Sequence, residues 1–269
     1  METTYLLVGG DRRQFWLSRL LVSRGRVFTL GVPGLEDSVP PDRPADVLIL
    51  PTPCMNGGGR LRGAGEGLQP SALLGLYDEH TRIYGGAVPE RIEALLPGCG
   101  PVTDLLLDPA VKAANGRLTA EAAAELTAER LEGSVFGLPC LVLGYGCVGK
   151  PLADLLMALH ARVTVAARRA SVRAEAVQSG CVACDFKSIP PFLRVIFNTV
   201  PAAVLEPEVL DALPGDCLWV ELASVPGGLP AGYIPAFDLL KANSLPGRRL
   251  PRSAAAILLE AILRCEVKA

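Results

Sequence analysis

This chain of 269 residues has few aromatic residues, few histidines and a small net charge. Only 5% of the residues are aromatic, two are histidines, and the formal net charge is −2. A chain with no excess of positive charge lacks the basic surface that attracts nucleic acids or anionic membranes. We therefore expect no nucleic acid and no membrane among its partners.

Long apolar runs are also missing. No uninterrupted apolar stretch reaches the roughly 20 residues that a membrane-spanning helix needs. The N-terminus carries Glu2 and no basic segment ahead of an apolar core, so a secretory signal peptide is not expected. The sequence therefore predicts a cytoplasmic protein.

Metal-binding and basic catalytic patterns are lacking as well. Cys181 and Cys184 form a C-x-x-C pair, but no second pair or nearby histidine completes a site, so no metal is expected. No histidine follows His160, so the histidine–carboxylate pair of 2-hydroxy-acid dehydrogenases is absent from the second half. Because no general base and no other catalytic residue can be assigned, alcohol oxidation by a side-chain base is disfavoured.

The most informative segment that is present spans residues 141–150 and reads LVLGYGCVGK. An apolar strand leads into G-x-G-x-x-G, and an apolar helical pattern follows. Glycines permit a tight turn, close approach of a pyrophosphate and helix–strand packing, while the helix N-terminus favours phosphate. The pattern predicts a Rossmann domain whose cofactor-binding turn is formed by Gly144, Tyr145, Gly146, Cys147, Val148 and Gly149.

The end of the next strand distinguishes NAD from NADP. NAD-specific folds place an acidic residue there, about 20 residues after the first glycine. This chain has Arg168 and Arg169 instead. Guanidinium groups match the oxygens of a 2′-phosphate, so NADP is the expected cofactor. The alternative is that these arginines are merely solvated at a strand end.

Two later strand ends carry polar residues. Asn198, Thr199, Val200 and Pro201 follow an apolar strand and are expected on the nicotinamide side of the cofactor site. Glu221 lies at the end of another strand and is a further candidate. The alternatives are a capping role for the first group and an ordinary strand position for Glu221.

The first half alternates strands and helices by itself, which indicates a small flavodoxin-like parallel sheet. We predict an α/β protein in which this substrate-side domain and the Rossmann domain enclose a cleft. The expected boundaries are 1–118 for the first domain, 119–133 for a bridging helix and 134–250 for the Rossmann domain. A C-terminal helix over 251–267 is expected to pack back on the first domain.

Substrate residues are expected where strands of the first domain end, because ligands bind there in open parallel sheets. Asp11, Arg12 and Arg13 follow the first strand, and Thr52 follows the third. Adjacent arginines suit a carboxylate, whereas the alternative is a helix-capping Asp11 with solvated arginines. The glycine-rich stretch over 54–69 is either functional or disordered. Its Asn56 and Arg60 are candidates for the same site as Thr52, and the sequence leaves the role of the stretch open.

Several segments, in order along the chain, resemble the A subunits of dipicolinate synthases from spore-forming bacteria. They are GGDRRQ at 9–14, Asn115 with TAE at 119–121, GYGCVGK at 144–150, NTVP at 198–201, LPGR at 245–248 and PRSA at 251–254. One departure is Ala122, where that family tends to have glycine.

The resemblance implies an NADP-linked oxidoreductase that acts on a CH–CH bond and converts dihydrodipicolinate to the dicarboxylate dipicolinate. It further implies that a flavoprotein-like B subunit is the partner and that the chain works in the mother cell during sporulation, and it leaves a homo-oligomer open. Two other functions remain open. The chain is either another NADP-dependent dehydrogenase of a small carboxylic acid, or a nucleotide-binding partner without turnover of its own.

Overall fold

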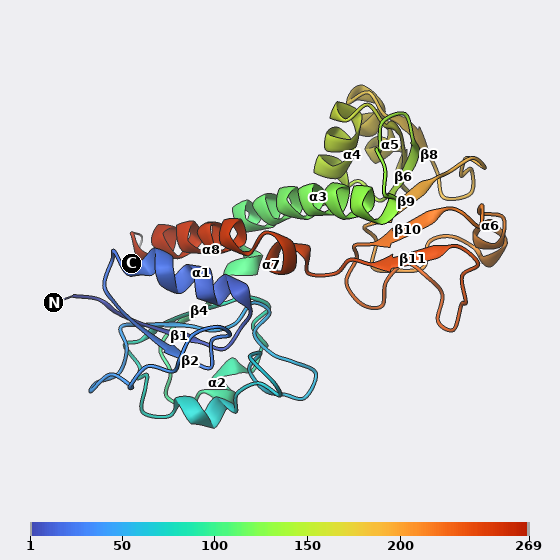
Figure 1. Cartoon of the computed structure of the whole chain (residues 1–269). Coiled ribbons are helices and arrows are strands. Elements are labelled where there is room, and N and C mark those ends of the chain that lie inside the picture. The colour runs from blue at the N-terminus through green and yellow to red at the C-terminus, as the bar shows by residue number, and fades with distance from the viewer. Residues whose placement is uncertain (1, 268–269) are drawn as a thin grey trace. The chain divides into compact units, whose positions relative to one another are not determined.

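The computed structural model describes residues 2–267, and these form two compact units. Unit 1 contains the residues up to Ala114 together with those from Gly247 on, and unit 2 spans Asn115–Pro246. The chain therefore starts and ends in the same unit, as the blue and red ribbons show (Figure 1). Each unit is built on its own parallel sheet.

Unit 1 contains a five-stranded parallel sheet in the order β2-β1-β3-β4-β5. This is the strand order of flavodoxin-like folds, so the predicted flavodoxin-like sheet is confirmed. Its strands are β1 (Thr4–Val8), β2 (Arg26–Leu30), β3 (Val47–Ile49), β4 (Arg82–Gly85) and β5 (Val102–Asp104). Its helices are α1 (Arg12–Leu21), α2 (Ile92–Leu95) and α8 (Pro251–Glu266), with 3-10 turns at Pro70–Leu73 and Leu105–Leu107. The short helix α7 (Leu245–Arg249) contains the point where the chain passes from unit 2 back into unit 1.

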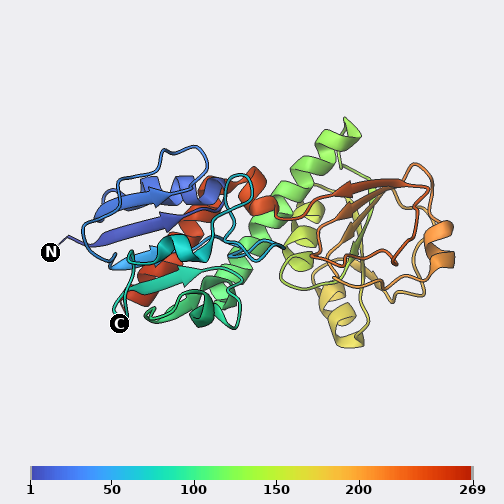
Figure 2. The same ribbon diagram turned by 90° about the horizontal axis from the view of Figure 1, so that it is seen from below.

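Helix α8 packs against α1 within unit 1. Leu17 and Leu21 of α1 share one buried apolar cluster with Leu258 and Ile262 of α8, and the two ribbons lie side by side in Figure 1. Figure 2 shows the same helix, in red, against the strands of unit 1. The hydroxyl of Tyr84 and the guanidinium of Arg82 both bind Glu266 at the end of α8. The C-terminal segment thus completes the core of the first unit.

Unit 2 contains a six-stranded parallel sheet in the order β11-β10-β9-β6-β7-β8, which is the Rossmann order. The predicted Rossmann domain is confirmed. Its strands are β6 (Pro139–Leu143), β7 (Arg162–Ala166), β8 (Val182–Cys184), β9 (Val195–Asn198), β10 (Leu218–Glu221) and β11 (Asp238–Lys241). Its shorter helices are α4 (Gly149–Ala158), α5 (Ala170–Gln178) and α6 (Pro207–Asp211).

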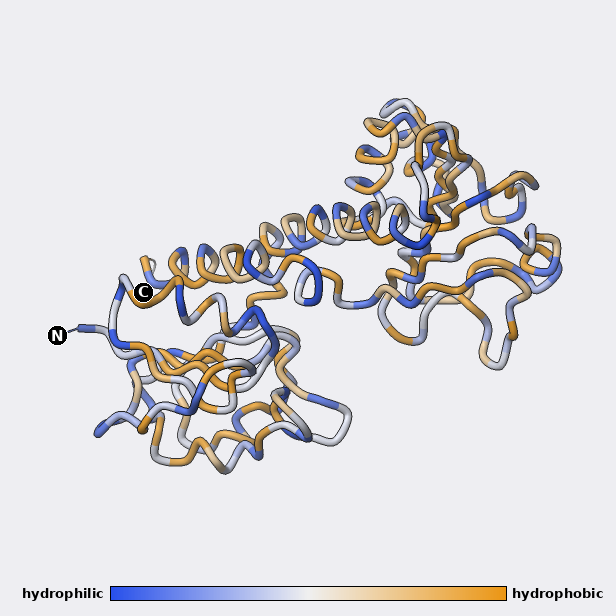
Figure 3. Tube along the Cα trace, viewed as in Figure 1, coloured by the Kyte–Doolittle hydropathy of each residue, from blue (hydrophilic) through white to orange (hydrophobic). Residues whose placement is uncertain are grey.

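The central strands are apolar on both faces, as expected for parallel strands that are covered on both sides. β1, β9 and β10 are buried at every position, and Trp219 and Phe197 are among the largest fully buried side chains. The hydropathy colouring shows these strands as mainly hydrophobic segments between more polar loops (Figure 3). Side chains that bind ligands or react are therefore expected at the strand ends and in the loops that follow them.

The helix expected over 119–133 is longer than predicted and begins earlier. Helix α3 runs from Pro109 to Leu131, and the Asp108 carboxylate accepts a hydrogen bond from the backbone N–H of Ala110 at its start (2.8 Å). Gly116 lies inside this helix, where glycine is normally unfavourable. A Cβ atom at Gly116 would lie 1.9 Å from the carbonyl oxygen of Cys147. Glycine is required there because the G-x-G-x-x-G turn packs directly on the helix.

Candidate functional site

Two glycines of the G-x-G-x-x-G turn are required by the protein itself. Gly144 has a φ of +88°, and a Cβ atom there would lie 2.7 Å from the Thr199 hydroxyl oxygen. A Cβ atom at Gly149 would lie 2.2 Å from the carbonyl oxygen of Gly144. The turn after β6 and the start of α4 are thus packed so closely that larger residues do not fit.

The middle glycine is different. A Cβ atom at Gly146 would meet no protein atom within 4 Å, so this backbone position faces open space. It borders a cavity of about 600 Å³ that is also lined by Tyr145, Val200 and Pro201. A glycine backbone that a ligand can approach closely, beside the N-terminus of a helix, is the arrangement that binds a pyrophosphate.

Arg168 and Arg169 line the same cavity and are exposed. None of the side chains lining this cavity is acidic. The neighbouring Arg173 is used differently, because its guanidinium donates to the backbone carbonyls of Ala167 and Arg168, both at 2.8 Å. Arg173 therefore fixes the chain after β7, while the two preceding arginines remain at the cavity. This part of the cavity suits a phosphate group.

Tyr145 and Lys150 flank the turn. Tyr145 is 9% exposed, and burial raises the pKa of its phenol further above its ordinary value near 10. The ammonium of Lys150 lies 2.6 Å from Glu175 and 6.0 Å from the centre of the Tyr145 ring. Tyr145 thus presents an apolar ring to the cavity, and Lys150 is already paired.

The other predicted cofactor residues support the turn rather than line the cavity. The Thr199 hydroxyl donates to the Leu143 carbonyl at 2.7 Å. Gly149 and Val148 lie at the start of α4, and Cys147 is exposed. The structure therefore brings the two arginines, the glycine turn and Val200–Pro201 together around one cavity, with Asn198 and Thr199 behind them.

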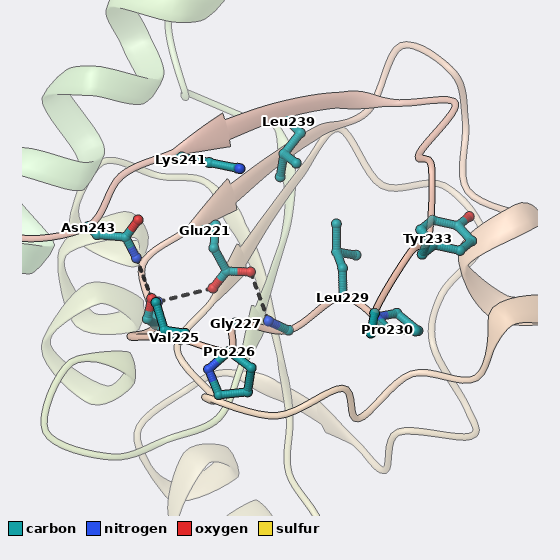
Figure 4. Close-up of a pocket in the computed structure, with 13 residues that line it drawn as sticks. Glu221, Val225, Pro226, Gly227, Leu229, Pro230, Tyr233, Leu239, Lys241 and Asn243 are labelled. Atoms are coloured by element: carbon teal, nitrogen blue, oxygen red, sulfur yellow. Dashed lines mark hydrogen bonds between the residues drawn. The ribbon is translucent and has the colours of Figure 1, made fainter. Parts of the chain in front are cut away.

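Asn198 and Glu221 form a buried pair behind the 198–201 turn. Asn198 is fully buried, and its amide donates to Glu221 (2.7 Å) and to the Val200 carbonyl (2.9 Å). The Glu221 carboxylate also accepts from the Trp219 indole (3.2 Å) and from two backbone N–H groups of the loop after β10, at Ala223 (3.1 Å) and Gly228 (3.0 Å). One carboxylate thereby holds both the turn and the loop in place, and Figure 4 shows its contacts with the loop.

A second cavity, of about 320 Å³, lies beside Glu221 and is lined by the loop after β10 and by Lys241 of β11. Tyr233 on its border donates its hydroxyl to Asp211 at 2.8 Å, and the Asn243 amide donates to the Ala223 carbonyl (Figure 4). Its polar groups are mostly engaged in holding the loop. This cavity therefore belongs to the support around Glu221.

We expect Glu221→Gln to lower the free energy of unfolding by about 2–3 kcal/mol, because an amide has one acceptor oxygen where the carboxylate serves four donors. Urea denaturation followed by circular dichroism measures this loss. Glu208→Gln, on an exposed position of α6, is the matched control and should change stability little. Equal stability of the two variants would show that the buried network is not needed.

The predicted substrate residues lie at the strand ends of unit 1. Arg13 is 9% exposed, and its guanidinium donates to Asp11 (2.7 Å) and to the Thr52 carbonyl. A Cβ atom at Gly247 of α7 would lie 2.6 Å from the Asp11 carboxylate, so the returning chain covers this ion pair. Arg12 is exposed to solvent. The guanidinium of Arg13 is thus bound by acceptors within the protein.

A cavity of about 310 Å³ opens at these strand ends. Asp11 and Thr52 line it together with Gly10, Asn56, Arg62, Gly63 and Gly65, whereas Arg12 and Arg13 do not. Arg62 was not among the residues predicted from the sequence. The only signal for it was an arginine inside a glycine-rich stretch that follows a strand.

No protein-family model matches the chain. The A subunit of dipicolinate synthase from Bacillus subtilis (strain 168) is 25% identical over 273 residues, which cover 94% of this chain and 92% of that protein. The resemblance to the dipicolinate synthase A subunits is confirmed. The similarity spans almost the whole chain, including both units.

Solved structures agree on the fold. The crystal structure of the dipicolinate synthase A subunit from Bacillus halodurans matches with a TM-score of 0.85 at 23% identity, covering 98% of this chain and 97% of that one. Its Bacillus subtilis counterpart gives 0.81 at 24% identity, covering 100% and 97%. A transhydrogenase from Sinorhizobium meliloti gives 0.65 at 12% identity, covering 97% and 91%.

Among the described residues, no helix has the length and apolar character to cross a membrane.

Proposed function

We propose that this chain is the A subunit of a dipicolinate synthase, an NADP-linked oxidoreductase that converts dihydrodipicolinate to dipicolinate. The observation that carries the proposal is the cavity at the G-x-G-x-x-G turn, with Arg168 and Arg169 on its border and no acidic side chain in its lining. The similarity to a dipicolinate synthase protein over 94% of the chain supports the choice of substrate.

The residues present fit a dinucleotide phosphate. The backbone at Gly144 and Gly146 would hold the pyrophosphate, and Arg168 and Arg169 the 2′-phosphate. The Asn198–Pro201 turn, held by Glu221, would lie on the nicotinamide side. Bound there, the cofactor would supply the hydride acceptor for the oxidation of the substrate ring.

The reaction removes a hydride and a proton from adjacent ring atoms and leaves an aromatic dicarboxylate. Aromaticity of the product favours the reaction, so a strong side-chain base is less necessary. This agrees with the lining of the cofactor cavity, which offers no acidic side chain. In the proposed oxidation the proton is released to solvent.

We further propose that the partner is a flavoprotein-like B subunit and that the pair works in the mother cell during sporulation. The Bacillus subtilis relative is one lettered subunit of its enzyme, which supports an assembly with a second one. Activity measured for the chain alone and with its partner separates this proposal from a nucleotide-binding protein without turnover. Substrates other than dihydrodipicolinate separate it from another small-carboxylate dehydrogenase.

Isothermal titration of the purified chain with NADPH and with NADH tests the cofactor assignment. We expect NADPH to bind at least about tenfold more tightly, a difference of about 1.4 kcal/mol. Equal affinity would contradict NADP specificity, and binding of neither nucleotide would contradict the proposed function itself.

A further inference from the structure

The glycine-rich stretch over 54–69 folds into a compact loop in unit 1. Antiparallel bridges join Met55 to Leu61 and Leu61 to Leu68, and Leu61 is fully buried. The side-chain oxygen of Asn56 accepts from the backbone N–H groups of Gly58 (2.9 Å) and Arg60 (3.1 Å). The loop therefore has a shape that its own hydrogen bonds maintain.

This loop closes onto the turn after β1. The backbone N–H of Gly10 donates to the Arg62 carbonyl at 2.7 Å. A Cβ atom at Gly9 would lie 2.0 Å from that same carbonyl oxygen, and Gly9 has a φ of +52°. Only glycine permits this approach. The loop and the turn thus form two walls of the 310 Å³ cavity, at the edge of the sheet where ligands bind in parallel α/β folds.

The charges around this cavity do not cancel. The Asp11 carboxylate is neutralised by Arg13, which leaves Arg62 as the unbalanced charge in the lining. The Nε of Arg62 donates to the Met55 carbonyl (3.3 Å). Among the residues that the structure describes, no acceptor binds the two terminal nitrogens of Arg62.

Thr52 supplies a second polar group. The residue is 7% exposed and lines the cavity, and its side chain packs against Gly86, where a Cβ atom would lie 2.7 Å from the hydroxyl oxygen. Its carbonyl accepts from Arg13, but its hydroxyl has no hydrogen-bond partner within the described part of the chain. The hydroxyl oxygen is itself accessible to solvent, so it is free to hydrogen-bond a ligand in the cavity.

We propose that this cavity binds a carboxylate group of the substrate, with the Arg62 guanidinium and the Thr52 hydroxyl as its anchors. A guanidinium matches a carboxylate with two parallel hydrogen bonds, and the cavity is close to the lower limit of about 300 Å³ for small-molecule sites. The inference rests on the proposed function for the identity of the dicarboxylate. It assigns substrate binding to the loop rather than to Arg12 and Arg13.

Calorimetric titration of dipicolinate into the full-length chain, with and without saturating NADPH, tests the assignment. We expect Arg62→Ala to weaken dipicolinate binding about 10- to 30-fold, the loss of one charge-assisted contact, while the Kd for NADPH stays within about twofold. Arg62→Lys keeps the charge but not the planar fork and should lose less. Thr52→Val should weaken binding about threefold to tenfold, as expected for a neutral hydrogen bond.

Arg60→Ala is the matched control, because Arg60 lies in the same loop, pairs with Glu66 and does not line the cavity. Thermal unfolding of each variant reports whether the loop change has spread to the fold. Dipicolinate binding that is lost equally in the Arg60 and Arg62 variants, or unchanged in Arg62→Ala, would overturn the inference. So would a wild-type chain that binds NADPH but no dipicolinate. Failure of NADPH binding alone, with an Arg62-dependent dipicolinate site, would contradict the cofactor proposal and support this site.

Discussion

Replacing Arg168 and Arg169 together with alanine should weaken NADPH binding about 30- to 100-fold, a loss of about 2–2.7 kcal/mol. Both side chains line the cavity beside the glycine turn, and both are exposed, so solvent screening reduces what each charge contributes. NADH lacks the 2′-phosphate, and its affinity should change by no more than about threefold. Titration calorimetry with both nucleotides measures the two Kd values.

The matched control removes two other arginines of unit 2. Arg162 begins β7 and Arg194 precedes β9, so both lie at the opposite, amino-terminal edge of the sheet. Arg162→Ala combined with Arg194→Ala changes the net charge by the same amount. Nucleotide affinity should hardly change in this variant. If NADPH and NADH weaken to the same extent in the Arg168/Arg169 variant, the 2′-phosphate assignment fails.

The adjacent residues Arg12 and Arg13 differ in their solvent exposure and in their contacts. Arg12 and Arg13 begin helix α1, where successive residues point about 100° apart. Arg13 is consequently buried and forms a half-buried ion pair with Asp11, while Arg12 is exposed to solvent. Sequence reasoning could place both at a strand end, but it could not tell which of them is free.

The fold was predictable wherever apolar strands carry a clear pattern. β1 and β6 are continuous apolar runs followed by glycine turns, and both sheets have the predicted class. β11 is short and follows a loop rich in proline and glycine, so no sequence pattern predicted this strand. Helix α3 begins at Pro109 and not near Thr119. It includes the weak helix formers Asn115 and Gly116, and the glycine turn packs directly against Gly116.

The cavity in unit 1 could not be read from the sequence for a related reason. Arg62 reaches it only through the folding of a glycine-rich loop, which depends on the side chain of Asn56 and on bridges between Leu61 and its neighbours. These are contacts across the loop and have no periodicity. The strand-end rule found Asp11 and Thr52, because strand ends follow from pattern alone.

Gly146→Ala should weaken NADPH and NADH binding alike, by at least about 100-fold or roughly 2.7 kcal/mol, without loss of stability. A Cβ atom at position 146 would have no protein atom within 4 Å, and the φ of Gly146 lies outside the left-handed region. A methyl group there would occupy the space through which a pyrophosphate approaches. The folded chain itself should tolerate it, since alanine also restricts the unfolded state.

Gly149→Ala is the comparison that separates ligand contact from packing. A Cβ atom at this position would lie 2.2 Å from the Gly144 carbonyl oxygen, and a backbone atom cannot move aside cheaply. We expect a loss of about 1–3 kcal/mol in the free energy of unfolding, measured by urea denaturation beside the nucleotide titrations. A Gly146→Ala variant that binds nucleotide normally would remove the turn from the cofactor site, because nothing in the protein itself demands glycine at that position.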